Sequence, residues 1–241
     1  MLVERLIQAE LLDELAAEDD RAVRSRADLR RLNRLMNHVG IIKALIRRSS
    51  LGPGALTLAD LGAGDGSFAL RLVRELRPTQ VISAITLVDR NACVLAEVRQ
   101  GLAGLGCELQ VVKQDVLPWL REAPAFSIMM ANLFLHHFPN DALGELLGRI
   151  GDRTDVFVAC EPRRAWLAWA ASCALGAIGC NSVTRHDARI SVRAGFTGRE
   201  LSSAWHERSG WELNEGPAGL FSHAFLASCA RQRRARAEGQ R

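Results

Sequence analysis

The chain has 241 residues, of which 48% are apolar and 24% are charged. This length and balance exclude a disordered chain and a small disulfide scaffold, and they predict one globular body with a sizeable core. The formal net charge of +4 equals the surplus carried by the last eleven residues, which hold five Arg and one Glu. We therefore expect a disordered basic tail at residues 231–241, with contact to RNA or anionic lipid as the alternative.

The six cysteines form no Cys-x-x-Cys pair, and none stands with histidines at zinc-binding spacing. They are expected to be reduced and mostly buried, and no metal site is predicted. The N-terminal segment contains Glu4 and Glu10 and has no continuous apolar stretch. No signal peptide is therefore expected, and a cytoplasmic location follows.

The first fifty residues are expected to form two helices that make an N-terminal lid. The first helix ends before the acids at residues 18–20, and the second begins at Asp28, where Leu29 and Leu32 start a helical spacing of apolar residues. Gly40 is expected to interrupt the second helix. The Ser, Gly and Pro residues at 49–54 predict a loop.

Residues 51–230 alternate between strand and helix patterns and are expected to form a second, larger unit. Strands are expected at residues 55–60, 85–88 (within the stretch 81–89), 108–113, 126–131, 156–159, 211–214 and 224–228, and helices at 67–76, 92–102 and 141–150. This alternation implies right-handed crossovers and a sheet covered on both faces. We predict an α/β fold with a Rossmann-like, seven-stranded, mostly parallel sheet, helices on both faces and the N-terminal helical lid.

An uncharged segment spans residues 165–184, which is about the length of a membrane-spanning helix. Ser172, Gly176 and Gly179 interrupt its apolar residues, so a buried or lid helix is expected rather than a stable membrane span. Weak contact with a membrane or lipid is the alternative. The charged run at residues 184–193 is expected to be a loop, and residues 165–200 an insertion on the substrate side.

The most informative stretch is Asp60-Leu61-Gly62-Ala63-Gly64-Asp65-Gly66, between the first strand and the first helix of the alternating unit. Glycines at this place let a nucleotide ligand approach the backbone. A dinucleotide fingerprint needs its third glycine at position 67, where this chain has Ser67. Asp60 would repel a pyrophosphate, but it suits a ligand that carries an ammonium and a sulfonium group.

This stretch resembles the first motif of the class I S-adenosylmethionine-dependent methyltransferases, an acid followed by x-Gly-x-Gly-x-Gly. Later residues strengthen the resemblance, because the run Leu135-His136-His137-Phe138 after the fourth strand is similar to the ubiquinone and menaquinone methyltransferase branch. The resemblance is strong over residues 55–162 and loose beyond them. It implies that residues 51–230 are the catalytic domain and that S-adenosylmethionine is the cofactor.

The resemblance assigns the cofactor to the carboxyl ends of the strands. Asp89 is expected to accept both ribose hydroxyls and Asp115 the adenine amino group, with a helix cap and a plain turn as their respective alternatives. The residues predicted to bind the cofactor are Asp60, Gly62, Ala63, Gly64, Gly66, Asp89, Arg90, Asp115, Val116, Asn132 and Leu133.

A hydroxyl or acidic carbon loses a proton when it accepts a methyl group, and a histidine suits that task near pH 7. The predicted catalytic residues are His137, His136 and His186, and packing or capping is the alternative for the first two. Substrate contacts are expected from Met36, His38, Arg163 and Trp166, with a surface position as the alternative for Arg163.

These residues predict methyl transfer to a hydroxyl or an activated carbon of a hydrophobic small molecule, such as a phenolic, quinol-like or polyketide product. The pattern is also similar to bacterial methyltransferases that tailor polyketides in secondary metabolism. No proline pair follows Asn132, which argues against methylation of exocyclic base amines. An RNA methyltransferase that uses the Arg-rich tail and a non-catalytic cofactor-binding module remain as alternatives.

Overall fold

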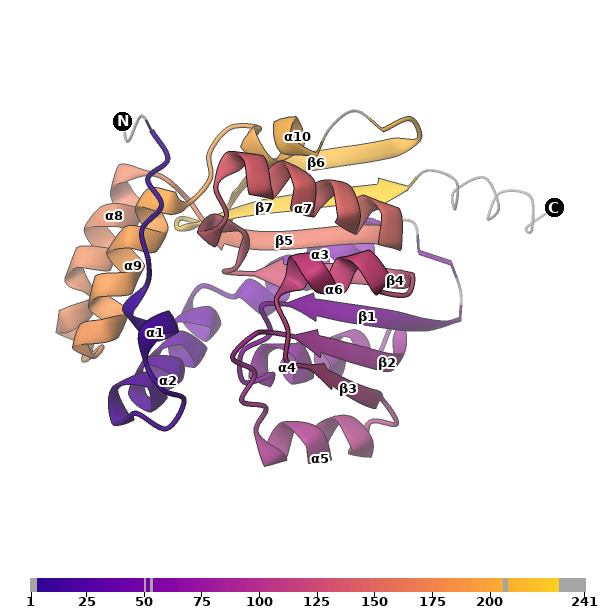
Figure 1. The fold of residues 1–241 in the computed structure, drawn as a ribbon, viewed down its shortest axis with the longest axis horizontal. Helices are drawn as coiled ribbons and strands as arrows, with labels where there is room; N and C mark the ends of the chain where they lie inside the picture. The colour runs from indigo at the N-terminus through magenta and orange to yellow at the C-terminus, as the bar shows by residue number, and fades with distance from the viewer. Residues whose placement is uncertain (1–3, 50, 53, 206–207, 230–241) are drawn as a thin grey trace.

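The computed structural model describes residues 4–49, 51–52, 54–205 and 208–229, and one sheet runs through them (Figure 1). Its strands are β1 (Ala55–Leu61), β2 (Val81–Val88), β3 (Glu108–Val112), β4 (Phe126–Asn132), β5 (Thr154–Pro162), β6 (Trp211–Ala218) and β7 (Ser222–Cys229). The sheet therefore has the seven strands that the sequence predicts. The basic tail expected at residues 231–241 lies outside the described residues.

The strands are arranged in the order β3-β2-β1-β4-β5-β7-β6. β1 to β5 are parallel, and β7 is antiparallel to both of its neighbours, β5 and β6. β1 lies between β2 and β4, so the chain changes direction across the sheet at this point. In such sheets a ligand binds beyond the carboxyl ends of the strands, beside the switch point. The predicted fold class is confirmed.

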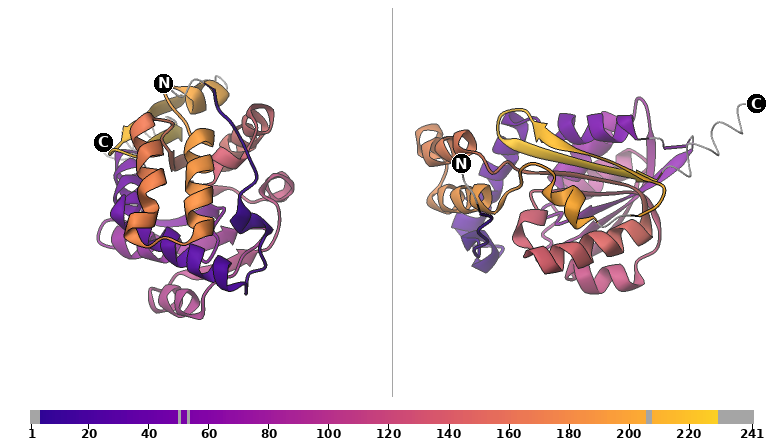
Figure 2. Two further views of the ribbon diagram at one scale, coloured as in Figure 1. Left: turned by 90° about the vertical axis from the view of Figure 1, so that its left-hand side faces the viewer. Right: turned by 90° about the horizontal axis from the view of Figure 1, so that it is seen from above.

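Helices cover both faces of the sheet, as Figure 2 shows. One face packs against α3 (His38–Arg48), α4 (Ser67–Leu76) and α5 (Ala96–Gly104), and the other against α6 (Val116–Glu122), α7 (Asn140–Arg153) and α10 (Glu200–Ala204). Because successive strand residues point to opposite faces, Leu58 joins the first core cluster and Ala59 the second. This two-sided burial explains why the central strands are mostly apolar on both faces.

A third layer lies beyond the carboxyl edge of the sheet, and we call it the lid half. It consists of the strap (residues 4–14), which ends in α1 (Leu11–Glu14), of α2 (Asp20–Leu35), and of the hairpin, which is α8 (Trp166–Cys173), the 3₁₀ helix η2 (Ala174–Ile178) and α9 (Ser182–Ala194). The strap runs along α9 (Figure 2). The Leu11 and Leu12 amides donate to the Asp187 carboxylate at 2.9 and 3.0 Å. The lid half is thus built from segments that are far apart in the sequence.

The N-terminal helices differ from expectation in where they begin and break. α2 begins at Asp20 rather than Asp28, because the Asp19 carboxylate caps it by accepting the Arg21 amide at 2.8 Å. The break before α3 falls at Asn37 rather than Gly40. Asn37 has a φ of 54°, a left-handed conformation that asparagine adopts more readily than most residues.

The hairpin corrects the expectation of a charged loop at residues 184–193. This run lies within α9, whose N-cap Asn181 accepts the Thr184 amide at 2.8 Å and whose apolar side chains Val183 and Ile190 are buried. The uncharged segment before it forms α8 and η2 rather than one helix. Within the described ranges, no helix is long and apolar enough to cross a membrane.

Candidate active site

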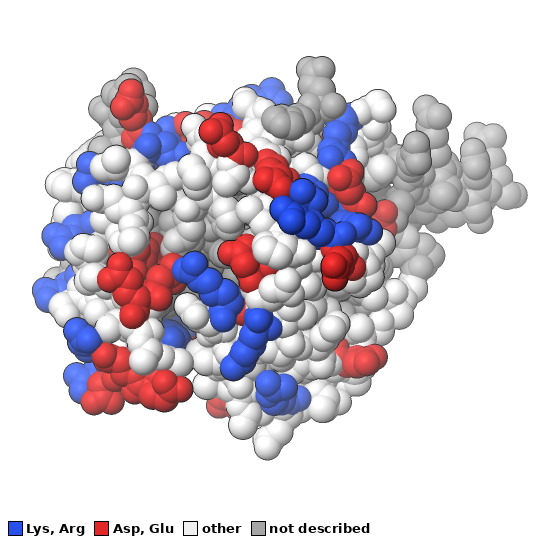
Figure 3. All heavy atoms as spheres, viewed as in Figure 1, with Lys and Arg blue, Asp and Glu red and all other residues white. Residues whose placement is uncertain are grey.

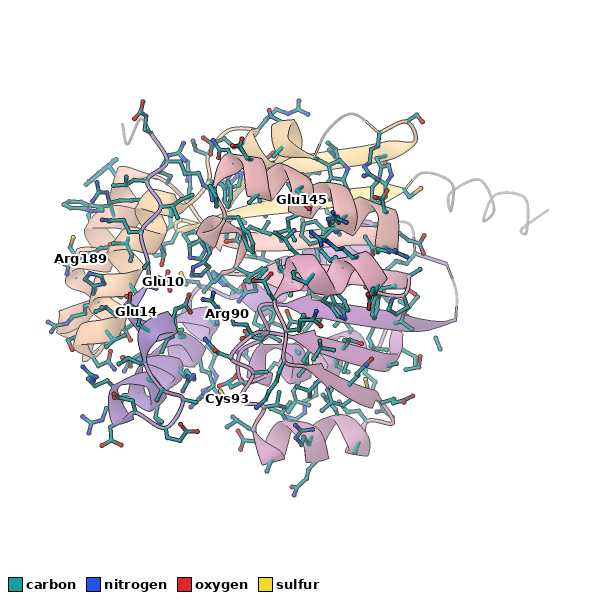
Figure 4. The ribbon with its side chains drawn as sticks, viewed as in Figure 1. Glu10, Glu14, Arg90, Cys93, Glu145 and Arg189 are labelled. Carbon is teal, nitrogen blue, oxygen red and sulfur yellow. The ribbon has the colours of Figure 1, made fainter. Side chains whose placement is uncertain are left out.

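A cavity of about 1090 Å³ lies between the carboxyl edge of the sheet and the lid half. Its other wall comes from the segments that follow β1, β2, β3 and β4, which are residues 60–68, 88–91, 114–116 and 132–134. We call these segments the cofactor half, after the ligand that the sequence predicts for them. Among the residues that Figure 4 labels, Glu10 and Glu14 lie on the strap and Arg90 lies just beyond β2, on the opposite wall.

The glycine-rich turn after β1 has a backbone that side chains would obstruct. Gly62, Gly64 and Gly66 have φ angles of 75°, 55° and 74°, in the left-handed region. A Cβ atom on Gly62 would lie 2.3 Å from the Phe134 ring, and one on Gly66 would lie 2.9 Å from Leu87. Gly62 and Gly64 line the cavity, whereas Gly66 packs beneath the turn. The turn therefore brings bare backbone to the cavity surface.

Asp89 connects the end of β2 to this turn. Its Oδ2 accepts the Gly64 amide at 2.9 Å, and its Oδ1 accepts the Asn91 amide at 2.7 Å. It does not cap α5, which begins later at Ala96. Each carboxylate oxygen can accept a further hydrogen bond, so Asp89 retains acceptors for two hydroxyl groups at the cavity wall.

Asp60 is the most buried acid of the cofactor half. It is 2% exposed and lines the cavity, and no residue of the described ranges donates a hydrogen bond to its carboxylate. Burial raises the pKa of Asp60 well above its usual value, and the negative charge of Asp89 raises it further. A cation in the cavity would favour the ionised form again. The two acids therefore suit a positively charged ligand.

The segment after β3 contributes a helix cap, and the segment after β2 contributes an ion pair with the strap. The Asp115 carboxylate accepts the Leu117 amide at 3.0 Å and caps α6, while Asp115 and Val116 both line the cavity. Capping and ligand contact are therefore compatible at this position. Arg90 also lines the cavity, and its Nη2 lies 3.2 Å from Asp13 Oδ2 on the strap.

The end of β4 is held by a neutral histidine. His38 Nδ1 lies 2.9 Å from Asn132 Oδ1, and His38 Nε2 lies 2.9 Å from Ser222 Oγ. Burial lowers the pKa of His38 to about 4, so the ring is neutral at pH 7. It can then donate from Nδ1 to Asn132 and accept from Ser222. Leu133, the next residue, has a φ of 56°, so the chain turns sharply at the cavity wall.

His136 lies between two carboxylates and carries a positive charge. Its Nδ1 lies 2.8 Å from Glu161 Oε2 at the end of β5, and its Nε2 lies 3.2 Å from Glu10 Oε1 on the strap. Burial would lower the pKa of His136, but the hydrogen bonds with both carboxylates raise it to about 9. Burial would raise the pKa of Glu10, but its bonds with His136 and Ser191 lower it to about 2.

His137 lies beside this pair in the opposite protonation state. The ring centroids of His136 and His137 are 4.3 Å apart, and His137 lines the cavity. Burial lowers the pKa of His137, and the positive charge of His136 lowers it further. His137 is therefore neutral at pH 7 and can accept a proton, whereas His136 already holds two.

Comparison with known proteins identifies the domain. Residues 58–154 match the model of a family described as a methyltransferase domain, and this range contains every predicted cofactor residue. Over these residues the chain carries a methyltransferase domain, and S-adenosylmethionine, the cofactor that the sequence predicts, is its methyl donor. A search of curated proteins found no significant sequence match.

Solved structures share the fold of this methyltransferase at low sequence identity. The plantazolicin methyltransferase BpumL in complex with SAH is 12% identical, with a TM-score of 0.62 over 88% of this chain and 91% of that one. BamL, solved with a triazolic desmethylPZN analog and SAH, is 13% identical, with a TM-score of 0.64 over 92% and 94%. An O-methyltransferase family protein from Burkholderia thailandensis is 17% identical, with a TM-score of 0.56 over 89% and 61%.

The structure separates the substrate and base candidates of the methyltransferase into two groups. Met36, His38, His136 and His137 line the cavity. Arg163, Trp166 and His186 do not line it. The Trp166 side chain is 71% exposed on α8, and His186 lies on α9 with its Nδ1 3.0 Å from Asp187 Oδ1.

Sequence reasoning missed Glu10 and Glu161, the two residues that charge His136. Glu161 is fully buried, and its Oε1 accepts the Phe134 and Leu135 amides at 3.0 and 2.9 Å. An acid at the end of an apolar strand was a usable signal for Glu161. The contact of Glu10 with His136 could not be predicted from the sequence, because the two residues are 126 positions apart. They meet only when the strap packs against the rest of the fold.

Proposed function

We propose that this methyltransferase transfers a methyl group to a hydroxyl or an activated carbon of a hydrophobic small molecule. The observation that carries the proposal is the continuity of one cavity from the glycine-rich turn to an apolar chamber under the lid half. Its volume, about 1090 Å³, is near the upper end of the range for a site that holds one ligand. The cavity can therefore accommodate the cofactor and a second small molecule.

The chamber walls favour an apolar acceptor. Leu29 and Leu32 contribute from α2 and Met36 from its C-cap, and Leu175 and Ile178 contribute from η2. Small residues of the hairpin, Ala168, Ala171, Ala174 and Ala188, widen the space between the helices. A ring or chain placed here would exchange water for apolar surface at about 25 cal/mol per Å². A bulky, charged acceptor would gain little from these walls.

We assign the general base to His137. When bound, the cofactor supplies an electrophilic methyl group on a sulfonium, and its positive charge disappears as the methyl leaves. His137 can take the acceptor's proton on its free ring nitrogen, because its lowered pKa keeps the ring neutral. His136 does not compete for this role, since Glu10 and Glu161 keep it protonated. The remaining acceleration comes from holding the acceptor in line with the methyl group, in a cavity that the lid half shields from water.

Known neighbours support a small-molecule acceptor. BamL was solved with a triazolic desmethylPZN analog, and the Burkholderia thailandensis protein is described as an O-methyltransferase family protein. These descriptions concern those proteins. They agree with the apolar chamber described above, which is the argument from this chain itself.

The test uses methyl-labelled S-adenosylmethionine with purified protein and host-cell extract, followed by separation of organic-soluble material, RNA and protein. Label in the organic fraction, lost with the His137→Gln variant, is the expected result. Label in RNA would overturn the proposal in favour of the RNA alternative, for which affinity falls steeply with salt. Cofactor binding without label in any fraction, repeated with purified phenols and quinols, would favour a non-catalytic binding module.

A further inference from the structure

The hairpin has an outer face that the methyl-transfer chemistry does not use. Trp166 and Trp169 of α8 are 71% and 43% exposed, and Leu167 and Ile178 are 40% and 48% exposed. They belong to the uncharged segment at residues 165–184. Two exposed tryptophans on one short helix form an apolar patch that is unusual on a water-facing surface.

The neighbouring helix α9 adds positive charge to the same outer face. Arg185, Arg189 and Arg193 stand four residues apart, so they form one stripe along α9, and all three are exposed. None of the described Asp or Glu side chains lies within 4.0 Å of these three guanidinium groups. Figure 3 shows Lys and Arg side chains along the left margin, over the region where Figure 1 labels α8 and α9.

The inner face of the same hairpin is part of the cavity wall. Ala168, Ala171 and Leu175 on one arm and Asp187 and Ser191 on the other line the cavity. The exposed tryptophans and arginines therefore lie on the side of the hairpin that faces away from the cavity. One thin layer of helix separates this outer face from the apolar chamber.

We propose that the outer face of the hairpin binds the surface of an anionic lipid bilayer. Tryptophan favours the boundary between headgroups and acyl chains, and arginine is attracted to anionic headgroups. An interfacial helix combines such apolar and basic faces without crossing the membrane. A second copy of this chain is a poorer partner, because symmetric pairing through this face would bring two arginine stripes together. The inference goes beyond the proposed function, since docking does not depend on which molecule is methylated.

The test is sedimentation of the full chain with vesicles of phosphatidylcholine, with and without phosphatidylglycerol. We expect binding that requires phosphatidylglycerol and a blue shift of tryptophan emission on binding. The variant Trp166→Ala with Trp169→Ala should bind about tenfold more weakly, because less apolar area enters the interface. Arg185→Gln with Arg189→Gln should weaken binding about fivefold for each arginine.

Matched controls lie at the opposite end of the sheet. Arg47→Gln with Arg48→Gln removes two exposed arginines at the end of α3, and Val81→Ala trims an exposed apolar residue at the start of β2. Every variant retains residues 231–241, so any contribution of the basic tail is common to all of them. Equal weakening by hairpin and control variants would overturn the proposal. So would a dimer in light scattering that the Trp166→Ala, Trp169→Ala variant abolishes.

The readouts separate this proposal from the proposed function. Vesicle binding is measured without substrate, so it succeeds or fails whatever molecule accepts the methyl group. With a water-soluble acceptor, the hairpin variants should keep the kcat of the parent chain. Normal vesicle binding by a hairpin variant would overturn the docking proposal, but it would not affect the proposed methyl transfer.

Discussion

The two walls of the cavity are built in different ways. In the cofactor half, the residues that line the cavity lie at or just after the carboxyl end of a parallel strand, as Asp60, Asp89 and Asn132 do. In the lid half, the contacts join segments that are far apart in the chain, such as the bond between Ser25 and Thr184 across 159 residues. The first wall is fixed by local sequence at strand ends, whereas the second exists only when the strap, α2 and hairpin pack together.

The chemistry also differs between the two walls. The cofactor half offers bare backbone and acids, which suit a cationic ligand of constant structure. The lid half offers apolar helices, and its residue Glu10 forms an ion pair with His136. This difference indicates that the lid half helps to set the protonation state of His136 as well as forming one wall of the cavity. The predictions below test that division from the largest expected effect to the smallest.

The largest effect is expected at His137, the proposed general base. His137→Gln should lower kcat by about 10²–10⁴-fold, because the acceptor loses its general base, with little change in cofactor affinity. In the parent enzyme the rate should rise with pH through the lowered pKa of His137 and then level off, since only the neutral ring accepts a proton. Steady-state kinetics against pH measures both results. His186→Gln, on α9 outside the cavity, is the matched control, and an equal loss in that variant would contradict the assignment.

Removal of Glu161 should destabilise the fold around His136. Glu161→Ala leaves His136 Nδ1 and the Phe134 and Leu135 amides without their acceptor, at a cost of about 3–5 kcal/mol in the free energy of unfolding. Urea denaturation at pH 7 measures this cost. Glu145→Ala, which removes an exposed partner of Arg149 on α7 (labelled in Figure 4), should cost about 0.5 kcal/mol or less. Similar losses in the free energy of unfolding for the two variants would show that the buried contacts of Glu161 add no more stability than a surface ion pair.

Within the cofactor half, Asp89→Ala should weaken S-adenosylmethionine binding by about 2–3 kcal/mol, or about 30- to 150-fold. The variant loses the proposed ribose acceptors and the bond that holds the Gly64 amide. Isothermal titration calorimetry measures the affinity, and circular dichroism checks that the variant is folded. Affinity equal to that of the parent chain would show that Asp89 only shapes the turn.

The smallest effect concerns pH and the buried acid of the same half. Because burial raises the pKa of Asp60, a fraction of the free protein is protonated there, and a cationic cofactor must displace that proton. Affinity for the cofactor should therefore fall as the pH drops below that pKa, by at most about tenfold per pH unit. Asp60→Asn should bind more weakly and lose this dependence. Calorimetry in buffers of different ionisation enthalpy would detect the released proton, and its absence would contradict the role of Asp60.

The sequence predictions for the cofactor half rest on local signals, and the structure places these residues together at one cavity. The spacing of Gly62, Gly64 and Gly66 identified the turn, and Asp89 and Asp115 were found simply as acids at strand ends. Ten of the residues so predicted line the cavity, all but Gly66, which packs beneath the turn. The lid half was harder, since apolar helical spacing does not say which face meets which neighbour. Trp166 was therefore expected to line the chamber, although it points to the outside of the hairpin.

The sequence by itself determined the strand and helix alternation, the glycine-rich turn and the acids that define the methyltransferase class, since each depends on residues close together in the chain. Only the tertiary structure decided which histidine is charged. His136 and His137 are adjacent and chemically identical, yet Glu10 and Glu161 contact one ring and leave the other neutral. Protonation depends on burial and on nearby charge, and both arise here from segments that folding brings together.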